Sequence, residues 1–427
     1  MAVPDPGAAD GAPDIALAAR LFDELRHRTG SSRGITRASY GLGEQIAHEI
    51  VRREALRLGL TCTTDAACNL YMTLKGAGAG PAIYVGSHLD SVPAGGNFDG
   101  AAGVLMGLAV VAGYCRAGIR PPQDITVMAI RAEESTWFGA SYIGSRAAFG
   151  LLTGAELDGV LRSGDRVALG AAIEAAGGDT GALRAGRPHL DPARIGAFIE
   201  PHIEQGPVLV AEGLPAAFVT GIRGSFRHRA ASVAGTYAHS GATPRANRQD
   251  AVLAAARLVT ALDDAWQRLA AAGHDLTVTF GQLSTDPAEA AFSKVAGRVE
   301  FSLDIRSESH ATLDLMRAEL RGAVARIEAD CAVRFTLGRE TTSEPALMAA
   351  PLVAALEDAA GALAVPARRM ACGAGHDAAV FAGAGVPSAM IFVRNANGSH
   401  NPDEAMEMAD FTDAARILSR FCLRPLP

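Results

Sequence analysis

The sequence predicts an α/β protein in which a mainly parallel sheet is interrupted by an inserted α+β domain. Two apolar strands at 82–86 and 125–130 flank a Gly/Ala-rich helix at 100–118, and this strand–helix–strand order is typical of parallel sheets. Between 222 and 337 the order changes to β-α-β-β-α-β, the order of a ferredoxin-like unit. The length of 427 residues also favours two or three domains, because one hydrophobic core rarely organises more than about 300 residues.

The larger domain is predicted from both ends of the chain. Apolar residues recur at helical spacing between 13 and 59, so two helices are expected there. A third buried strand is expected at 195–200. The C-terminal part adds a helix, a strand and a further helix, at 351–363, at 388–393 and from about 410.

The inserted domain is predicted from alternating and helical patterns. Its expected elements are a strand at 222–236, a helix at 248–272, strands at 276–283 and 298–305, a helix at 309–329 and a strand at 332–337. The whole chain is therefore divided into a disordered tail at 1–12, a discontinuous α/β domain at 13–218 and 340–427, and an inserted domain at 219–339.

Composition disfavours two classes of partner. The formal net charge of −7 provides no basic surface for a nucleic acid backbone. The sequence contains no apolar run of the roughly 18 residues that a membrane span needs. Its first residues also lack the cationic and apolar stretches of a secretory signal, so the cytoplasm is the expected location.

Side chains that can bind metal follow four predicted strands, where α/β sheets place their ligand sites. These residues are His88, Asp90 and Asp99 after the first strand, Glu133 and Glu134 after the second, His202 after the third, and His400 after the strand at 388–393. Each motif alone has an ordinary structural explanation, such as a hydrogen-bonded turn. Together, imidazoles and carboxylates without thiolates favour a catalytic site for two divalent metals that share one carboxylate.

Seven longer motifs carry a resemblance to a known family. They are GSHLDSVPAGGNFDG, RAEESTWFG, EPHIEQGP, GTYAHSGATPRANRQDA, FSLDIR, GAGHDA and GSHNPDE, between about Arg37 and Leu418. They resemble the dinuclear-zinc amidohydrolases of the aminoacylase and carboxypeptidase-G clan. The most similar branch contains the N-carbamoyl-L-amino-acid hydrolases, allantoate amidohydrolases and β-ureidopropionases.

The resemblance implies specific roles for the metal-binding motifs. One metal would be held by His88, Asp99 and His202, and the other by Asp99, Glu134 and His400, with Asp99 bridging. Glu133 would be the general base, and Asp90 would support the ring of His88. Zinc is favoured, with Mn, Co and Ni as alternatives.

The resemblance also implies substrate contacts. His239, supplied across a homodimer formed by the inserted domain, would polarise the scissile carbonyl, and Arg306 would bind the substrate carboxylate. The remaining implied contacts are Gln205, Asn247, Ser399 and Ser293, the last standing where the family usually has Asn.

The resemblance implies hydrolysis of an N-carbamoyl (ureido) amino acid or an allantoate-like substrate to ammonia, carbon dioxide and the amino acid. Two alternatives remain open. One is an aminoacylase or dipeptidase that acts on ordinary N-acyl amides. The other is an inactive, metal-free binding protein on the same scaffold.

Overall fold

The computed structural model describes residues 11–427, and the chain forms two compact units. The first contains the residues up to Thr220 and Leu347–Pro427, and the second is Gly221–Ala346. The second unit therefore extends past the expected boundary at 339. The reason is a late strand, β15 (Glu340–Ser343), which pairs with β9 (Gly224–Ala234) in the sheet of the second unit.

The predicted tail lies mostly outside the described residues, which begin at Gly11. Gly11 itself is buried, and its carbonyl oxygen accepts a hydrogen bond from the hydroxyl of Ser419 at 2.8 Å. The predicted disorder is therefore wrong at Gly11.

The first unit is built on a nine-stranded mixed sheet with the order β16-β8-β18-β7-β5-β6-β4-β3, and β17 pairs with β8. Its strands are β3 (Thr61–Thr64), β4 (Leu70–Leu74), β5 (Ala82–His88), β6 (Ile125–Ile130), β7 (Ile195–Ile203), β8 (Ala216–Ile222), β16 (Ala346–Leu347), β17 (Ala367–Cys372) and β18 (Ser388–Val393). The central strands β6, β5, β7 and β18 are parallel, whereas β4 joins β6 and β8 joins β18 in antiparallel pairs. The α/β class is confirmed, and the sheet is mixed rather than mainly parallel.

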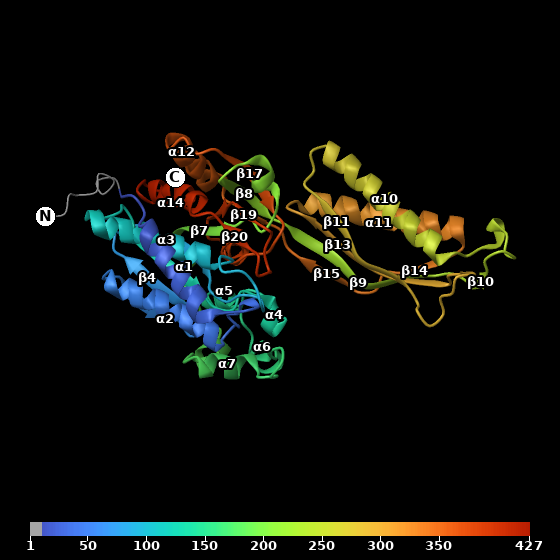
Figure 1. Ribbon diagram of the computed structural model, residues 1–427, viewed down its shortest axis with the longest axis horizontal. Helices are drawn as coiled ribbons and strands as arrows, with labels where there is room; N and C mark the ends of the chain where they lie inside the picture. Colours follow the sequence, from blue (N-terminus) through green and yellow to red (C-terminus); the bar gives the residue numbers. More distant parts are fainter. Residues whose placement is uncertain (1–10) are drawn as a thin grey trace. The chain divides into compact units, whose positions relative to one another are not determined.

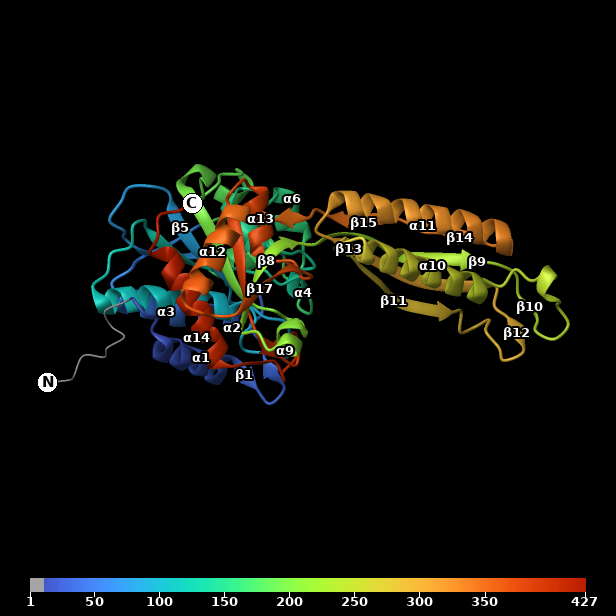
Figure 2. The same cartoon turned by 90° about the horizontal axis from the view of Figure 1, so that it is seen from above.

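Helices cover both faces of this sheet (Figures 1 and 2). The long helices are α1 (Ile15–Thr29), α2 (Leu42–Arg57), α3 (Ala101–Ala117), α12 (Ala350–Ala362) and α14 (Met408–Cys422). On one face, α3 comes close to the strands because Gly103 and Gly107 have no side chain; a Cβ atom at Gly103 would lie 2.2 Å from the carbonyl oxygen of Pro201. On the other face, the ring of Phe198 stacks on the ring of Phe381 in α13 (Asp377–Gly383), with 3.7 Å between the ring centroids.

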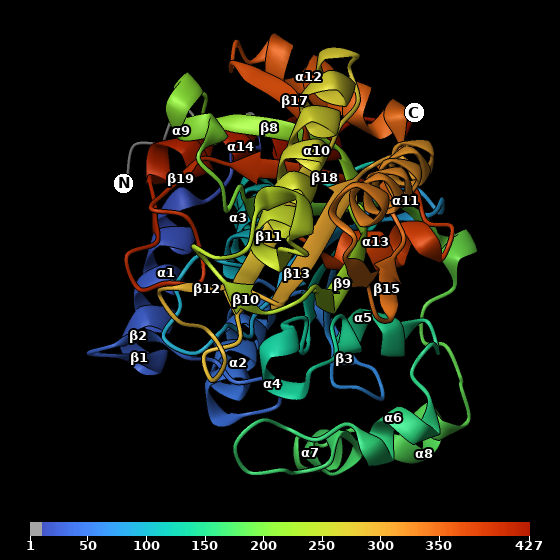
Figure 3. The same cartoon turned by 90° about the vertical axis from the view of Figure 1, so that its right-hand side faces the viewer.

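Short helices and ribbons complete the first unit. The helices are α4 (Ser135–Phe138), α5 (Ile143–Ala148), α6 (Gly154–Gly159), α7 (Leu169–Ala175), α8 (Thr180–Arg184) and α9 (Val208–Glu212), and the two-stranded ribbons are β1 (Gly30–Ser31) with β2 (Gly34–Ile35) and β19 (Asn395–Ala396) with β20 (Ala405–Met406). Helices α6, α7 and α8 contact one another, as Figure 3 shows. They enclose a separate apolar cluster that includes Leu157, Leu169 and Ile173.

The second unit is the expected ferredoxin-like domain. Its main elements are β9, α10 (Ala251–Ala271), β11 (Thr277–Thr285), β13 (Arg298–Ser307), α11 (His310–Cys331) and β14 (Arg334–Thr336), with β10 (Ala238–His239) and β12 (Lys294–Val295) forming a separate ribbon. The sheet order is β11-β13-β9-β14, and all of its pairs are antiparallel. Figures 1 and 2 show α10 and α11 together on one face, over a core that includes Leu258, Leu262 and Met316.

Within residues 11–427, no helix combines the length and apolar character needed to span a bilayer.

Candidate metal centre

The candidate centre lies at the carboxyl ends of the parallel strands of the first unit. His88 is the last residue of β5, and Glu133 and Glu134 follow β6 after Arg131 and Ala132. His400 lies in the loop between β19 and β20. His202 was expected beyond its strand, but it lies within β7, because the strand continues in parallel pairing with β18 as far as Ile203. The four predicted motifs therefore converge in one unit.

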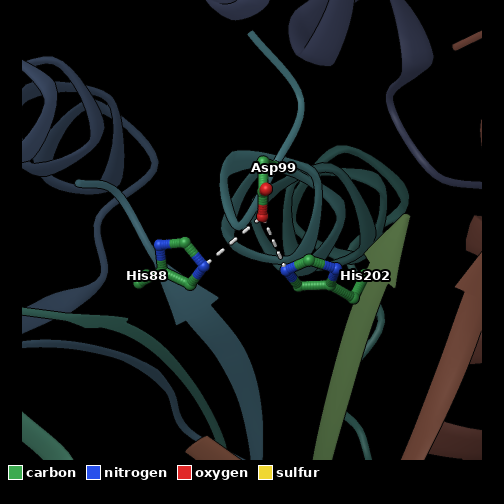
Figure 4. Close-up of side chains that lie close together, drawn as sticks. All are labelled: His88, Asp99 and His202. Atoms are coloured by element: carbon green, nitrogen blue, oxygen red, sulfur yellow. Dashed lines mark ion pairs between the residues drawn. The ribbon is translucent and has the colours of Figure 1, made fainter. Parts of the chain in front are cut away.

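The first group of possible ligands is His88, Asp99 and His202, all buried (Figure 4). Asp99 Oδ1 lies 3.1 Å from His202 Nε2 and 3.7 Å from His88 Nε2. Within the group, one ligand atom from each residue lies within 4.8 Å of the others. Two imidazoles and a carboxylate at this spacing match the ligand preference of a borderline divalent metal.

The second group is Asp99, Glu134 and His400, and its ligand atoms also lie within 4.8 Å of one another. His400 Nε2 is 3.3 Å from Asp99 Oδ2 and 3.6 Å from Glu134 Oε1. The Oδ1 atom of Asp99 therefore faces the histidines of the first group, and its Oδ2 atom faces His400 of the second. The His400 side chain is 52% exposed, so this group is open to solvent on one side. Solvent access of this kind fits a catalytic metal site better than a closed structural one.

The hydrogen bonds of the two buried histidines fit a metal. His202 Nδ1 lies 2.9 Å from the carbonyl oxygen of Ile203, and its Nε2 accepts the N–H of Gly100 at 3.2 Å. His88 Nδ1 lies 3.1 Å from the carbonyl oxygen of Asp90. These contacts turn Nδ1 of both rings to backbone carbonyl oxygens and Nε2 towards Asp99, which is the orientation of metal-binding histidines.

Asp90 connects the first two loops of the centre. Its carboxylate accepts the backbone N–H groups of Glu133 and Glu134 at 3.2 and 3.1 Å, and it accepts the hydroxyl of Ser39 at 2.6 Å. Its Oδ1 also lies 3.3 Å from His88 Nδ1. Asp90 thus fixes both the His88 ring and the paired glutamates.

The adjacent glutamates have unusual titration behaviour. Burial raises the pKa of Glu133 well above its usual range, and the carboxylates of Glu134 and Asp377 add to the rise. Burial and the charge of Asp99 raise the pKa of Glu134 to about 7. Burial opposes ionisation of Asp99, but hydrogen bonds with His202 and His400 outweigh it and hold the pKa of Asp99 well below its usual range. So many carboxylates in one buried place favour the binding of a cation.

Backbone conformation is unusual around the centre. Gly100 has φ +66°, and a Cβ atom there would lie 2.5 Å from the His88 ring, so only glycine fits between Asp99 and α3. Ala132, Gln205 and His400 have positive φ values of 52°, 63° and 62°. Positive φ is uncommon in residues other than glycine, and such strain often accompanies functional sites.

Two predicted substrate contacts, Gln205 and Ser399, lie beside Asp99. The amide nitrogen of Gln205 donates to Asp99 Oδ2 at 2.9 Å, and the hydroxyl of Ser399 donates to the same oxygen at 2.6 Å. The amide oxygen of Gln205 is buried and has no hydrogen-bond partner among the described residues. The structure therefore places both side chains in the centre.

Sequence reasoning missed Glu404 as a functional residue. Glu404 Oε1 accepts the backbone N–H groups of Phe98 and Asp99 at 2.9 and 3.2 Å, and Oε2 lies 2.7 Å from the hydroxyl of Ser399. The carboxylate therefore connects the Asp99 loop to the Ser399–His400 loop. The GSHNPDE motif contains Glu404, but only the fold shows which groups it contacts.

The other predicted substrate contacts belong to the second unit. His239 is exposed in β10, and Asn247 is exposed at the end of a short 3-10 turn (Arg245–Asn247). Ser293 is exposed and accepts the N–H of Ser240 at 2.9 Å through its carbonyl oxygen. Arg306 lies on β13 and donates to both carboxylate oxygens of Asp304, the shortest distance being 2.8 Å.

Comparison with known proteins agrees with the resemblance expected from the motifs. Residues 84–424 match the peptidase family M20/M25/M40. The chain is 35% identical over 391 residues to an N-carbamoyl-L-amino acid amidohydrolase of Geobacillus stearothermophilus, which covers 91% of this chain and 92% of that protein. It is 30% identical over 388 residues to the allantoate amidohydrolase of Escherichia coli, covering 90% of this chain and 92% of that one.

A solved structure supports the same grouping. An amidase of the hydantoinase/carbamoylase family from Burkholderia multivorans matches with a TM-score of 0.86 and 30% sequence identity, over 96% of this chain and 98% of that one. The similarity therefore includes both units, and the family resemblance is confirmed.

Proposed function

Because the chain belongs to the peptidase family M20/M25/M40, we propose that it is an amidohydrolase that cleaves the ureido group of an N-carbamoyl amino acid or an allantoate-like substrate. The observation that carries the proposal is the convergence of five metal-binding side chains, with Asp99 shared between two groups. The named relatives, an N-carbamoyl-L-amino acid amidohydrolase and an allantoate amidohydrolase, support a substrate of the ureido class.

In this proposal the centre holds two divalent cations. His88, Asp99 and His202 would hold one, and Asp99, Glu134 and His400 would hold the other. When bound, divalent cations supply Lewis acidity towards a carbonyl oxygen and lower the pKa of water. The mixture of imidazole and carboxylate favours zinc, and it also accepts Mn, Co or Ni.

Glu133 is the proposed general base. Its burial beside other carboxylates favours a proton on its carboxyl group more than in an exposed glutamate. The side chain removes a proton from the attacking water and then delivers it to the leaving nitrogen. Asp90 keeps Glu133 in place through the backbone bond at 3.2 Å.

The proposed products follow from the bond that breaks. Water adds to the ureido carbonyl carbon, and the C–N bond to the amino acid nitrogen breaks. The nitrogen gains the proton that Glu133 carries, so the free amino acid leaves. The remaining carbamate decomposes to ammonia and carbon dioxide.

The second unit supplies the proposed contacts to the substrate. His239, from a second copy of the chain, donates a hydrogen bond to the scissile carbonyl oxygen. The planar guanidinium of Arg306 binds the substrate carboxylate in a bidentate manner. Gln205, Asn247, Ser293 and Ser399 complete the proposed contacts.

Homodimerisation through the second unit is part of the proposal. β11 is an edge strand of its sheet, and most of its side chains are exposed. Leu283 on β11 is 51% exposed, and Val252 and Leu253 on α10 are 46% and 42% exposed. An edge strand offers unpaired backbone groups to a strand of another chain. Leu283→Lys should convert a dimer into a monomer, and light scattering measures the change in mass. Leu315→Lys, at an exposed position on α11, is the control and should leave the dimer intact. A dimer that persists in Leu283→Lys would contradict this interface.

The direct test of the function is a substrate panel after metal removal and reloading. We expect ammonia release from N-carbamoyl amino acids or allantoate only in the metal-loaded protein. N-formyl and N-acetyl amino acids and dipeptides distinguish an aminoacylase or peptidase. A purified protein that contains no metal and gains no activity on reloading would instead favour the alternative of an inactive, metal-free binding protein.

A Glu133→Gln variant tests the proposed base. We expect kcat to fall by about 100- to 10,000-fold, the usual contribution of general acid–base catalysis, while the metal content stays unchanged. The matched control is Glu49→Gln, at an exposed position on α2, which should keep wild-type turnover. Retained turnover in Glu133→Gln with full metal content would exclude Glu133 as the base.

A further inference from the structure

The turn that carries His239 is attached at its start to the segment around β12 of the same chain. β10 pairs with β12, and His239 lies opposite Lys294. The next residue, Ser240, donates its backbone N–H to the carbonyl oxygen of Ser293 at 2.9 Å. The backbone of His239 is therefore fixed on one side, although its side chain is exposed.

The ring of His239 is held by the turn that follows it. Nδ1 accepts the backbone N–H groups of Gly241 and Ala242 at 3.2 and 3.1 Å. A nitrogen that accepts two hydrogen bonds carries no hydrogen, so these bonds assign the hydrogen of the neutral ring to Nε2. Nε2 is then the only donor that the ring can offer to a ligand.

A single side chain, Arg248, closes this turn. Its Nε donates to the carbonyl oxygen of Thr243 at 2.9 Å, and its Nη2 donates to the carbonyl oxygen of Ser240. Those two carbonyl groups lie on either side of the amides of Gly241 and Ala242. The backbone N–H of Thr243 returns to the carbonyl oxygen of His239 at 3.1 Å.

Arg248 is itself connected to a rigid element. Two residues later, Asp250 caps α10 by accepting the backbone N–H groups of Val252 and Leu253, both at 3.1 Å. The Arg248 side chain is half-buried, as are Ser240 and Thr243, whereas Gly241 and Ala242 between them are exposed. Since the guanidinium group is planar and its donors are fixed in direction, both carbonyl groups are held at once.

We propose that Arg248 is the positioning residue of His239: it holds the 240–243 turn in the conformation whose amides fix the Nε2–H form of the ring. The inference rests on the proposed function, which assigns the scissile carbonyl oxygen to His239. His239 then works as a neutral hydrogen-bond donor that is oriented before the substrate binds. Such preorganised donors are effective because they need no rearrangement during the reaction.

Steady-state kinetics form the first part of the test. Arg248→Met should lower kcat on an N-carbamoyl amino acid by about 10- to 100-fold, because a misplaced donor loses its alignment with the oxyanion. KM and metal content should change little. Arg248→Lys, which keeps a cationic donor, should recover part of the loss. The matched control is Arg268→Met, at an exposed residue on α10 that forms an ion pair with Glu319, and it should retain wild-type kcat.

A double-mutant cycle separates positioning from general damage to the fold. If Arg248 acts through His239, then Arg248→Met should have almost no further effect on kcat in a His239→Ala background. Full additivity of the two losses would overturn the inference. A melting temperature equal to that of the wild type shows that each variant is folded.

Nitrogen-15 NMR of labelled histidine supplies a measurement that does not depend on activity. The His239 signals, assigned by their loss in His239→Gln, should show a single Nε2–H tautomer in the wild type and a mixture in Arg248→Met. An unchanged ring in Arg248→Met overturns the role of Arg248, even if the wild type is an active ureido hydrolase. If the wild type hydrolyses no ureido substrate but the tautomer depends on Arg248, the proposed function fails and the positioning role stands.

Discussion

At the scale of single residues, Glu404 should affect metal affinity although it belongs to neither group of possible ligands. It holds the amides of Phe98 and Asp99 and contacts Ser399, so it fixes the loop that presents the shared carboxylate. Glu404→Ala would leave two buried amides without an acceptor. We expect metal affinity to fall by about 10- to 100-fold, as for other residues that support metal ligands.

Competition with a chelator of known affinity measures this effect without relying on turnover. Glu404→Gln keeps an acceptor oxygen for the amides and should lose less affinity than Glu404→Ala. Equal affinities in the wild type and Glu404→Ala would contradict the supporting role of Glu404.

A second residue, His48 on α2, should make stability depend on pH. The side chain is buried, and neither ring nitrogen has a hydrogen-bond partner among the described residues. Burial lowers the pKa of His48 well below its usual range. The unfolded chain therefore binds a proton near pH 6.5 that the folded chain does not, so the contribution to stability is complete above that pH and is lost as the pH falls.

The loss should approach about 1.4 kcal/mol per pH unit below pH 6.5 for this one group. Urea unfolding at pH 7.5, 6.5 and 5.5 measures it, and His48→Leu should reduce the slope. Because other histidines also titrate, the informative quantity is the difference between variant and wild type. An identical slope in both proteins would show that His48 does not titrate as expected.

At the scale of elements, the sequence predicted strands better where every residue of the strand is buried. The strands at 125–130 and 388–393 coincide with β6 and β18, because continuous apolar runs mark them. The extent of β7 was underestimated because its last residues are held by pairing with β18, more than 180 positions away. Helices α4 to α8 were not predicted, since each is short and depends on packing within its neighbourhood.

The candidate site was also predictable only in part. Their positions near strand ends made His88, Asp99, Glu134, His202 and His400 candidates, and the resemblance to the family implied that these five are the ligands; the structure brings them together in two groups. The supporting contacts could not, because Ser39 and Glu404 act on residues that are distant in sequence. Nor does any sequence pattern show that Gln205 and Ser399 donate to Asp99, since that requires the loops to be placed in space.

The contact between α3 and β7 provides a test at this scale. Gly103 has no room for a side chain, because its Cβ would lie 2.2 Å from the carbonyl oxygen of Pro201. Gly103→Ala should therefore displace the start of α3 from β7 and separate Asp99 from His202. We expect a loss of about 1–3 kcal/mol in the free energy of unfolding and weaker metal binding.

Gly361 near the end of α12 is the matched control, because nothing lies within 4 Å of its Cβ position. Gly361→Ala should leave stability unchanged or raise it by about 0.5–1 kcal/mol through helix propensity. Denaturant unfolding measures the free energy of unfolding of both variants, and metal titration measures their metal affinity. If Gly103→Ala retained wild-type stability and metal affinity, close packing of α3 would not be what positions Asp99.

At the scale of the whole molecule, the two units divide the proposed chemistry between them. All five candidate ligands belong to the first unit, whereas His239 and Arg306 belong to the second. Each unit has a hydrophobic core of its own, and that of the second includes Leu258 and Met316. Metal binding should therefore stabilise only the first unit directly.

Calorimetry with and without metal tests this division. A ligand present at about 100 times its dissociation constant stabilises the state that binds it by about 2.7 kcal/mol. Chelation should thus lower the unfolding temperature of the first unit by several degrees, and reloading should restore it, while a transition of the second unit stays in place. His202→Ala should abolish the metal-dependent shift, whereas His239→Ala should retain it because its imidazole lies outside the ligand groups. A chelator that shifted both transitions equally would mean that metal binding stabilises the molecule as one cooperative body.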